Sequence, residues 1–139
     1  MDERGSTGGV RSLLRLEGAA LLAAALFLYA QSGASWKWFF ILFLVPDLAV
    51  VFYAFGARAG AFAYNTTHST IGPFLLAFVS QFDFAKLGPA DLPTLFPIAL
   101  IWFAHVGFDR ALGYGLKYFA GFGFTHLGRI GNAAKTSAN

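Results

Sequence analysis

The chain has 139 residues, of which 57% are hydrophobic, 18% aromatic and only 12% charged. Soluble domains carry roughly 25% charged residues, and one of this size buries only about two-thirds of its surface. Seventeen Phe and a mean hydropathy of +0.59 therefore exclude a soluble globular protein. The absence of cysteine excludes disulfides, zinc–thiolate sites and cysteine nucleophiles. The pI near 9.5 does not indicate a nucleic-acid partner, because the cations flank apolar segments and form no basic cluster with interleaved aromatics.

The first apolar segment covers residues 13–30 and follows a polar, glycine-rich stretch, residues 1–12, that we expect to be a flexible tail. Basic residues before the segment and small residues after it are typical of a cleaved secretory signal. Glu17 interrupts the apolar region, however, and further apolar segments follow. We therefore predict a retained first transmembrane helix.

Two further helices are predicted in the middle of the chain. The second covers residues 38–55, a length of roughly 18–20 residues that spans the hydrocarbon core. Pro46 within it predicts a kink and a main-chain carbonyl that needs another partner. The third helix covers residues 59–81 and contains the most polar intramembrane run of the chain, residues 65–70.

A loop is expected over residues 82–92, and Pro93 suits the start of a fourth helix that continues to Leu112. The predicted domains are thus a four-helix transmembrane domain over 13–118 and a C-terminal cytoplasmic or interfacial tail over 119–139. The pattern shows no internal repeat and no strand.

An even number of spans places both termini on one side of the membrane. Eight of the ten Lys and Arg residues fall on that side, and Lys37 and Lys86 fall on the other. The eight are Arg4, Arg11, Arg15, Arg58, Arg110, Lys117, Arg129 and Lys135. By the positive-inside rule, we expect an all-α, integral membrane four-helix bundle with both termini in the cytoplasm.

Titratable groups from all four helices fall at a similar depth. With about 1.5 Å of rise per residue, Glu17 lies roughly 9 Å along its helix, Asp47 and His68 roughly 13 Å, His105 roughly 12 Å and Asp109 roughly 6 Å. His105 and Asp109 are four residues apart and share one helix face. Ionisable groups at such depth must face the protein interior or water. The pattern predicts a shared polar site.

These residue types predict a metal site. Helix bundles build such sites from inward side chains on facing helices, and histidines with carboxylates suit zinc, iron or manganese. The candidate ligands are His68, His105, Asp109 and Asp47, with His126 as a further ligand if the tail folds back, and Asn65 lies at the same depth. In this hypothesis Asp47 or Glu17 acts as a general base and Arg110 holds an anion. A metal-bound water at this level would hydrolyse a lipid-like ester or phosphoester.

Other interpretations remain open. In the first, His105 and Asp109 form an ion pair without further function, and Arg110 reaches the lipid headgroups. In the second, His68 and Asn65 serve only to form hydrogen bonds between helices. A second functional hypothesis is a non-catalytic accessory subunit of a larger membrane complex, respiratory or photosynthetic, or a homo-oligomer, in which a histidine ligates haem or a pigment. A solute or proton carrier ranks third, since no pseudo-repeat is present. Tyr114 and Lys117 are expected as interfacial anchors.

Several motifs over residues 11–131 resemble an uncharacterised family of small bacterial integral membrane proteins, described only as a domain of unknown function. They are Leu16-Glu17-Gly18, Pro46-Asp47-Leu48, Tyr64-Asn65-x-x-His68, His105-x-Gly107-x-Asp109-Arg110-x-x-Gly113-Tyr114-Gly115-Leu116-Lys117-Tyr118 and Thr125-His126-Leu127-Gly128-Arg129. The resemblance implies a four-helix protein of the bacterial inner membrane and no established activity. This chain differs in placing Phe119, Phe122 and Phe124 where the family is more polar, which suggests cover by lipid or another protein.

Overall fold

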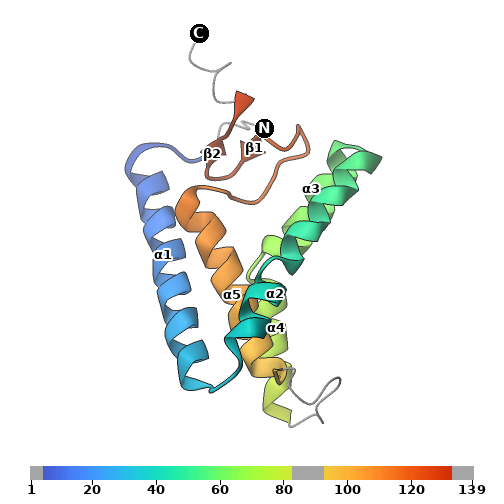
Figure 1. Ribbon diagram of the computed structural model, residues 1–139. Coiled ribbons are helices and arrows are strands. Elements are labelled where there is room, and N and C mark those ends of the chain that lie inside the picture. The colour runs from blue at the N-terminus through green and yellow to red at the C-terminus, as the bar shows by residue number, and fades with distance from the viewer. Residues whose placement is uncertain (1–4, 83–92, 133–139) are drawn as a thin grey trace.

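The computed structural model describes residues 5–82 and 93–132 and consists of helices that run up and down a bundle (Figure 1). The elements are α1 (Gly8–Gln31), α2 (Trp36–Phe43), the 3-10 helix η1 (Val45–Phe55), α3 (Ala57–His68), α4 (Ile71–Val79), the 3-10 turn η2 (Ser80–Phe82), α5 (Leu95–Leu112), β1 (Phe124–Thr125) and β2 (Gly128–Arg129). The start of α1, the end of α5 and the β1–β2 hairpin lie at one end of the bundle, which we call the hairpin end.

Three of the described helices are long and apolar enough to cross a membrane: Gly8–Gln31, Trp36–Phe55 and Leu95–Leu112. A shorter apolar helix, Ile71–Phe82, continues the path of α3. The predicted all-α membrane bundle is therefore confirmed. The cations Arg4, Lys86 and Lys135 and most of the predicted loop over 82–92 lie outside the described residues.

The second and third predicted helices are each broken in two. The predicted kink at Pro46 is confirmed: α2 ends at Phe43 and the chain continues as a 3-10 helix. The prediction of one continuous helix over 59–81 is wrong, because α3 ends at His68 and α4 begins at Ile71. Pro73 lacks an N–H for the carbonyl four residues earlier, and the preceding Ser and Thr residues compete for main-chain hydrogen bonds.

The closest helix pair is α1 against α5, and two glycines allow it. A Cβ on Gly107 would lie 2.7 Å from the main-chain nitrogen of Leu22 and 2.8 Å from the carbonyl oxygen of Gly18. A Cβ on Gly18 would lie 2.6 Å from Cβ of Arg110. Small residues let the backbones of membrane helices approach in this way. This contact fixes the position of the buried face of α5 along the axis of α1.

The tail after α5 is folded, which the sequence pattern did not predict. Phe124 pairs with Arg129 and Thr125 with Gly128 in a short antiparallel hairpin. The buried hydroxyl of Thr125 donates a hydrogen bond to the carbonyl oxygen of Gly128 at 2.7 Å. The strands have two residues each, too short for an alternating hydrophobic pattern to be visible in the sequence.

Candidate metal centre

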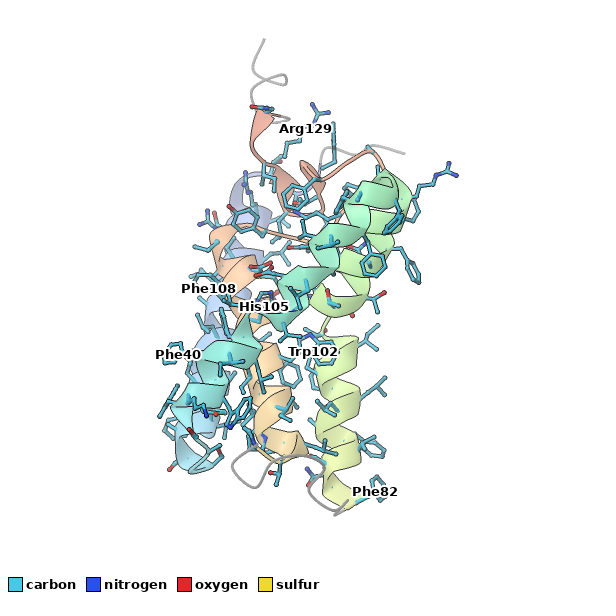
Figure 2. All side chains as sticks on the ribbon, turned by 45° about the vertical axis from the view of Figure 1, so that its right-hand side comes forward. Phe40, Phe82, Trp102, His105, Phe108 and Arg129 are labelled. Atoms are coloured by element: carbon cyan, nitrogen blue, oxygen red, sulfur yellow. The ribbon has the colours of Figure 1, made fainter. Side chains whose placement is uncertain are left out.

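Four titratable side chains from η1, α3 and α5 meet inside the bundle. They are Asp47, His68, His105 and Asp109, each of which offers one ligand atom, and these four atoms all lie within 4.8 Å of one another. Figure 2 shows His105 at mid-height in the bundle, between Phe108 and Trp102 along α5. This group, the His/Asp cluster, is the largest concentration of ligating groups among the described residues.

The distances within the His/Asp cluster suit one central ion. The Nε2 atoms of His68 and His105 are 3.0 Å apart. Oδ1 of Asp47 lies 3.5 Å from His68 Nε2 and 3.6 Å from His105 Nε2, and Oδ2 of Asp109 lies 3.5 Å from His68 Nε2. A tetrahedral zinc with bonds of about 2.0–2.1 Å separates its ligand atoms by roughly 3.3–3.4 Å. Three of these four distances lie within about 0.3 Å of that value, and all four ligand atoms lie within 4.8 Å of one another.

Helix α5 supplies His105 and Asp109 from adjacent turns of one face. His105 is almost completely buried, and the ring of Phe43 packs edge-on against its imidazole with centroids 5.1 Å apart. Phe43 also contacts Phe108, so aromatic side chains close this side of the site. A continuous helix thus fixes two candidate ligands at i and i+4 in apolar surroundings.

The two remaining candidate ligands lie where helices break. Asp47 is in the first turn of η1, directly after Pro46, and His68 is the last residue of α3. The Thr67 hydroxyl joins the breaks by donating to the carbonyl oxygen of Pro46 at 3.2 Å. Within a bilayer, irregular backbone is tolerated where it is buried in protein, and 3-10 segments inside a helix often mark functional positions. The two breaks place the Asp47 carboxylate 3.5 Å from the His68 imidazole.

Hydrogen bonds orient His68. Its Nδ1 lies 2.9 Å from the carbonyl oxygen of Tyr64, a contact that needs the ring proton on Nδ1 and leaves the Nε2 lone pair facing the cluster. The Tyr64 ring stacks on the imidazole at 3.6 Å between centroids, and its hydroxyl donates to Oδ2 of Asp109 at 2.7 Å. Outer contacts of this kind typically fix metal ligands. Tyr64 was not predicted as part of the site, because only tertiary contacts reveal it.

The charges of the cluster call for a cation. Two carboxylates with two neutral imidazoles carry a net charge of −2, and anionic groups at membrane depth need a partner. A ring-to-ring hydrogen bond accounts for the contact between His68 and His105, but it brings no positive charge to the carboxylates; Asp109 interacts electrostatically with Lys117. Nδ1 of His105 is buried without a hydrogen-bond partner among the described residues, whichever group binds Nε2.

The cluster is open on one side only. The exposed fraction of the side chain is 1% for His105, 3% for His68 and 14% for Asp109, but 48% for Asp47. Three candidate ligands are thus enclosed by protein, while Asp47 borders the surroundings. A site with one accessible edge can admit water or a substrate group, as catalytic metal sites do.

Four residues predicted at the site or at its depth lie elsewhere. Glu17 is exposed on α1 and interacts electrostatically with Arg110, so the predicted general base and anion holder face each other outside the cluster. His126 is in the β1–β2 turn, where its Nδ1 accepts a hydrogen bond from the main-chain N–H of Leu116 at 2.8 Å. Asn65 binds the main chain of Lys117. None of these residues belongs to the His/Asp cluster.

Lys117 was predicted to be an interfacial anchor, but its position in the structure differs. Its side chain is buried, and Nζ has no hydrogen-bond partner among the described residues. The amine lies over the rings of Phe122 at 4.0 Å, Tyr64 at 4.8 Å and Tyr114 at 5.7 Å. Burial lowers the pKa of Lys117 to about 8, against an opposing effect of Asp109. The Phe-rich tail therefore covers a cation of the protein itself.

Comparison with known proteins agrees with the motif resemblance. Residues 11–130 match the family described as Domain of unknown function (DUF4260), and the chain belongs to this family. No curated protein matches, and no solved structure matches. The residues that form the His/Asp cluster all fall inside the matched region.

Proposed function

We propose that this protein is an integral membrane metalloprotein that binds one divalent cation through His68, His105 and Asp109, with the Asp47 carboxylate beside the ion at the open edge. The observation that supports the proposal best is the 3.0 Å approach of two imidazole Nε2 atoms beside two carboxylates. The contact with Tyr64 already directs the lone pair of His68 toward the centre. A divalent cation neutralises the two carboxylates and gives both imidazoles the same partner.

The ligand set suits zinc, iron or manganese. Imidazole favours zinc and iron, while carboxylates extend the range to manganese. Ligation of a haem between the two histidines is disfavoured, because the Nε2 atoms face each other at 3.0 Å and leave no room for a macrocycle. The accessory-subunit hypothesis stays a prediction, and no contact among the described residues supports it.

Hydrolysis of a lipid-like ester or phosphoester is the chemistry that we propose for this site. A divalent metal can bring the pKa of a bound water close to 7 and polarise a carbonyl or phosphoryl oxygen. Asp47 borders the open edge, so its carboxylate is the group best placed to take a proton from that water. His68, His105 and Asp109 lie behind it and hold the ion.

The orientation of the site in the membrane follows from charge. Among the described residues, the hairpin end carries Arg11, Arg15, Arg58, Arg110, Lys117 and Arg129, and the opposite end carries Lys37. By the positive-inside rule we propose that the hairpin end faces the cytoplasm of a bacterial inner membrane. The metal centre then serves the inner leaflet.

Metal analysis of the purified protein tests the proposal. Protein extracted in detergent and passed through a desalting column is analysed for zinc, iron and manganese, together with the variants His105→Ala and Asp109→Asn. We expect about one metal per chain in the wild type and a strong loss in both variants. Glu17→Gln is the matched control, because it removes a membrane-level carboxylate outside the cluster and is expected to keep the metal. Wild-type protein that stays metal-free after incubation with all three ions would refute the proposal.

A further inference from the structure

A cleft of about 200 Å³ lies beside the metal centre, at the level where the second and third spans are broken. Its walls come from α2, η1, the end of α3 and α5. The lining residues are Leu42, Val45, Pro46, Thr67, Ile98, Ile101 and Trp102. Figure 2 shows Trp102 next to the α3–α4 side of the bundle, one turn farther from the hairpin end than His105.

Three residues that line the cleft are close to candidate ligands in the chain. Pro46 precedes Asp47 and Thr67 precedes His68 in the chain, and Ile101 lies one helical turn before His105. A molecule in the cleft therefore has one end next to the His/Asp cluster. None of the four candidate ligands lines the cleft, but these neighbours place its apolar lining next to the charged cluster.

The polar groups that line the cleft already have partners. The indole N–H of Trp102 donates to the carbonyl oxygen of Thr67. The single hydroxyl proton of Thr67 has the carbonyl oxygens of Pro46, Ala63 and Tyr64 within hydrogen-bond distance. A buried water needs several polar partners, and this lining offers none that are free. Hydrocarbon is the better occupant, and the volume exceeds the roughly 150 Å³ of an apolar cavity known to hold benzene in another protein.

The charged and apolar parts of the site also follow each other in a definite order along the bundle axis. The charged cluster lies nearer the hairpin end, while Ile98, Ile101 and Trp102 lie deeper along α5. An amphiphile in the leaflet at that end has its polar head outward and its chain toward the bilayer centre. The site therefore has the same order of polar and apolar parts as a lipid in that leaflet.

We propose that the cleft binds one acyl chain of a membrane amphiphile and thereby delivers the ester, phosphoester or carboxylate at the head of that chain to the metal centre. This deepens the proposed function by naming the substrate class. Binding of the polar head group requires the metal, whereas binding of the acyl chain in the cleft does not. The two parts can therefore fail separately.

Quenching of Trp102 by a brominated chain tests the inference. The protein is prepared with Trp36→Phe and Trp38→Phe, so that Trp102 is its only tryptophan. It is reconstituted in phosphatidylcholine vesicles, loaded with zinc, and titrated with 9,10-dibromostearic acid. We expect quenching that saturates at a low mole fraction of the acid, with most of the Trp102 emission lost.

Two valines of η1 provide a matched pair of variants. Val45 lines the cleft and Val51 does not, and both side chains are exposed, at 49% and 66%. Val45→Phe narrows the cleft and is expected to abolish saturable quenching, whereas Val51→Phe retains it. Since both positions face outward, the same substitution carries little risk to folding at either.

The methyl ester of the same acid separates the chain from the head. If both proposals hold, the acid binds more tightly than the ester in zinc-loaded protein, and chelation removes the difference. If saturable quenching is equal for acid and ester with or without zinc, the chain site stands and the metal proposal loses its support here. Quenching that only follows the bulk content of bromine, alike in Val45→Phe and Val51→Phe, would overturn the inference, since the cleft would then be bathed by ordinary bilayer lipid.

Discussion

The carboxamide of Asn65 forms two hydrogen bonds with the main chain of Lys117, 52 residues later in the sequence. The Lys117 N–H donates to Oδ1 at 2.6 Å, and Nδ2 donates to the Lys117 carbonyl oxygen at 2.9 Å. One side chain of α3 thereby holds the tail that follows α5. This contact places the Lys117 amine over Tyr64, whose hydroxyl in turn binds Asp109. The tail and the metal centre are therefore mechanically connected.

Asn65→Ala should release the tail without unfolding the helices. It leaves a main-chain N–H and a carbonyl of Lys117 without partners, and each such loss typically costs about 1–3 kcal/mol. We expect faster hydrogen exchange at the amides of the tail and little change in α1 and α5. Thr66→Ala is the control, because the Thr66 hydroxyl bonds only to its own helix, at the carbonyl oxygen of Phe62. Equal exchange in both variants would show that Asn65 does not hold the tail.

Tyr64→Phe should weaken metal binding while keeping the helix packing. The variant retains the ring that stacks on His68 but loses the hydrogen bond to Asp109. Loss of such an outer contact typically lowers metal affinity about 10–100-fold. Competition with a fluorescent chelator measures the change, with Tyr114→Phe as a tyrosine control outside the cluster. A wild-type affinity in Tyr64→Phe would mean that the phenol does not support the ligand.

The pH dependence of stability should report on Lys117. Burial lowers the pKa of this amine from 10.5 to about 8. Between these values the unfolded chain binds more protons than the folded one, so the free energy of unfolding rises with pH from about 8 to about 10.5. Thermal unfolding in detergent should therefore occur at a higher temperature near pH 9.5 than near pH 7.5.

Lys117→Met isolates this effect. Methionine fills a similar volume among the rings of Tyr64 and Phe122 without a charge to bury. We expect the variant to be more stable than the wild type near neutral pH and to lose the rise in melting temperature on the alkaline side. An unchanged alkaline rise in Lys117→Met would assign it to another group.

Depth along the helices predicted the four titratable residues that come together, but it also included Glu17. Asp47, His68, His105 and Asp109 occur at similar rise in three spans, and membrane burial forces such groups inward. Rise alone does not fix the direction of a side chain around the helix axis. Glu17 has a suitable depth but lies on an exposed face of α1, near Arg110. Its assignment to the site was therefore beyond what spacing could decide.

The contacts around the site depend on tertiary structure that no local pattern encodes. Asn65 lies at the depth of the site in the sequence, yet its partner is the main chain of Lys117 in the tail. The break between α3 and α4 depends on Pro73 and on the Thr67 hydroxyl reaching Pro46 across two spans. Kinks near prolines are predictable, but the partners of the freed groups are not.

The approach of α1 to α5 at Gly107 carries the last prediction. A Cβ at this position would meet the main chain of α1, at Leu22 nitrogen and Gly18 oxygen, and main-chain atoms cannot move aside as a flexible side chain can. Gly107→Ala should therefore separate the two helices and shift His105 and Asp109, which flank it on α5. We expect a lower melting temperature in detergent, by an amount that corresponds to about 1–3 kcal/mol for overpacking, and reduced metal content. Gly9→Ala is the matched control on α1, because a Cβ there meets nothing within 4 Å and alanine favours the helix. If Gly107→Ala were as stable as Gly9→Ala and contained as much metal, the contact between α1 and α5 would not determine the position of His105 and Asp109.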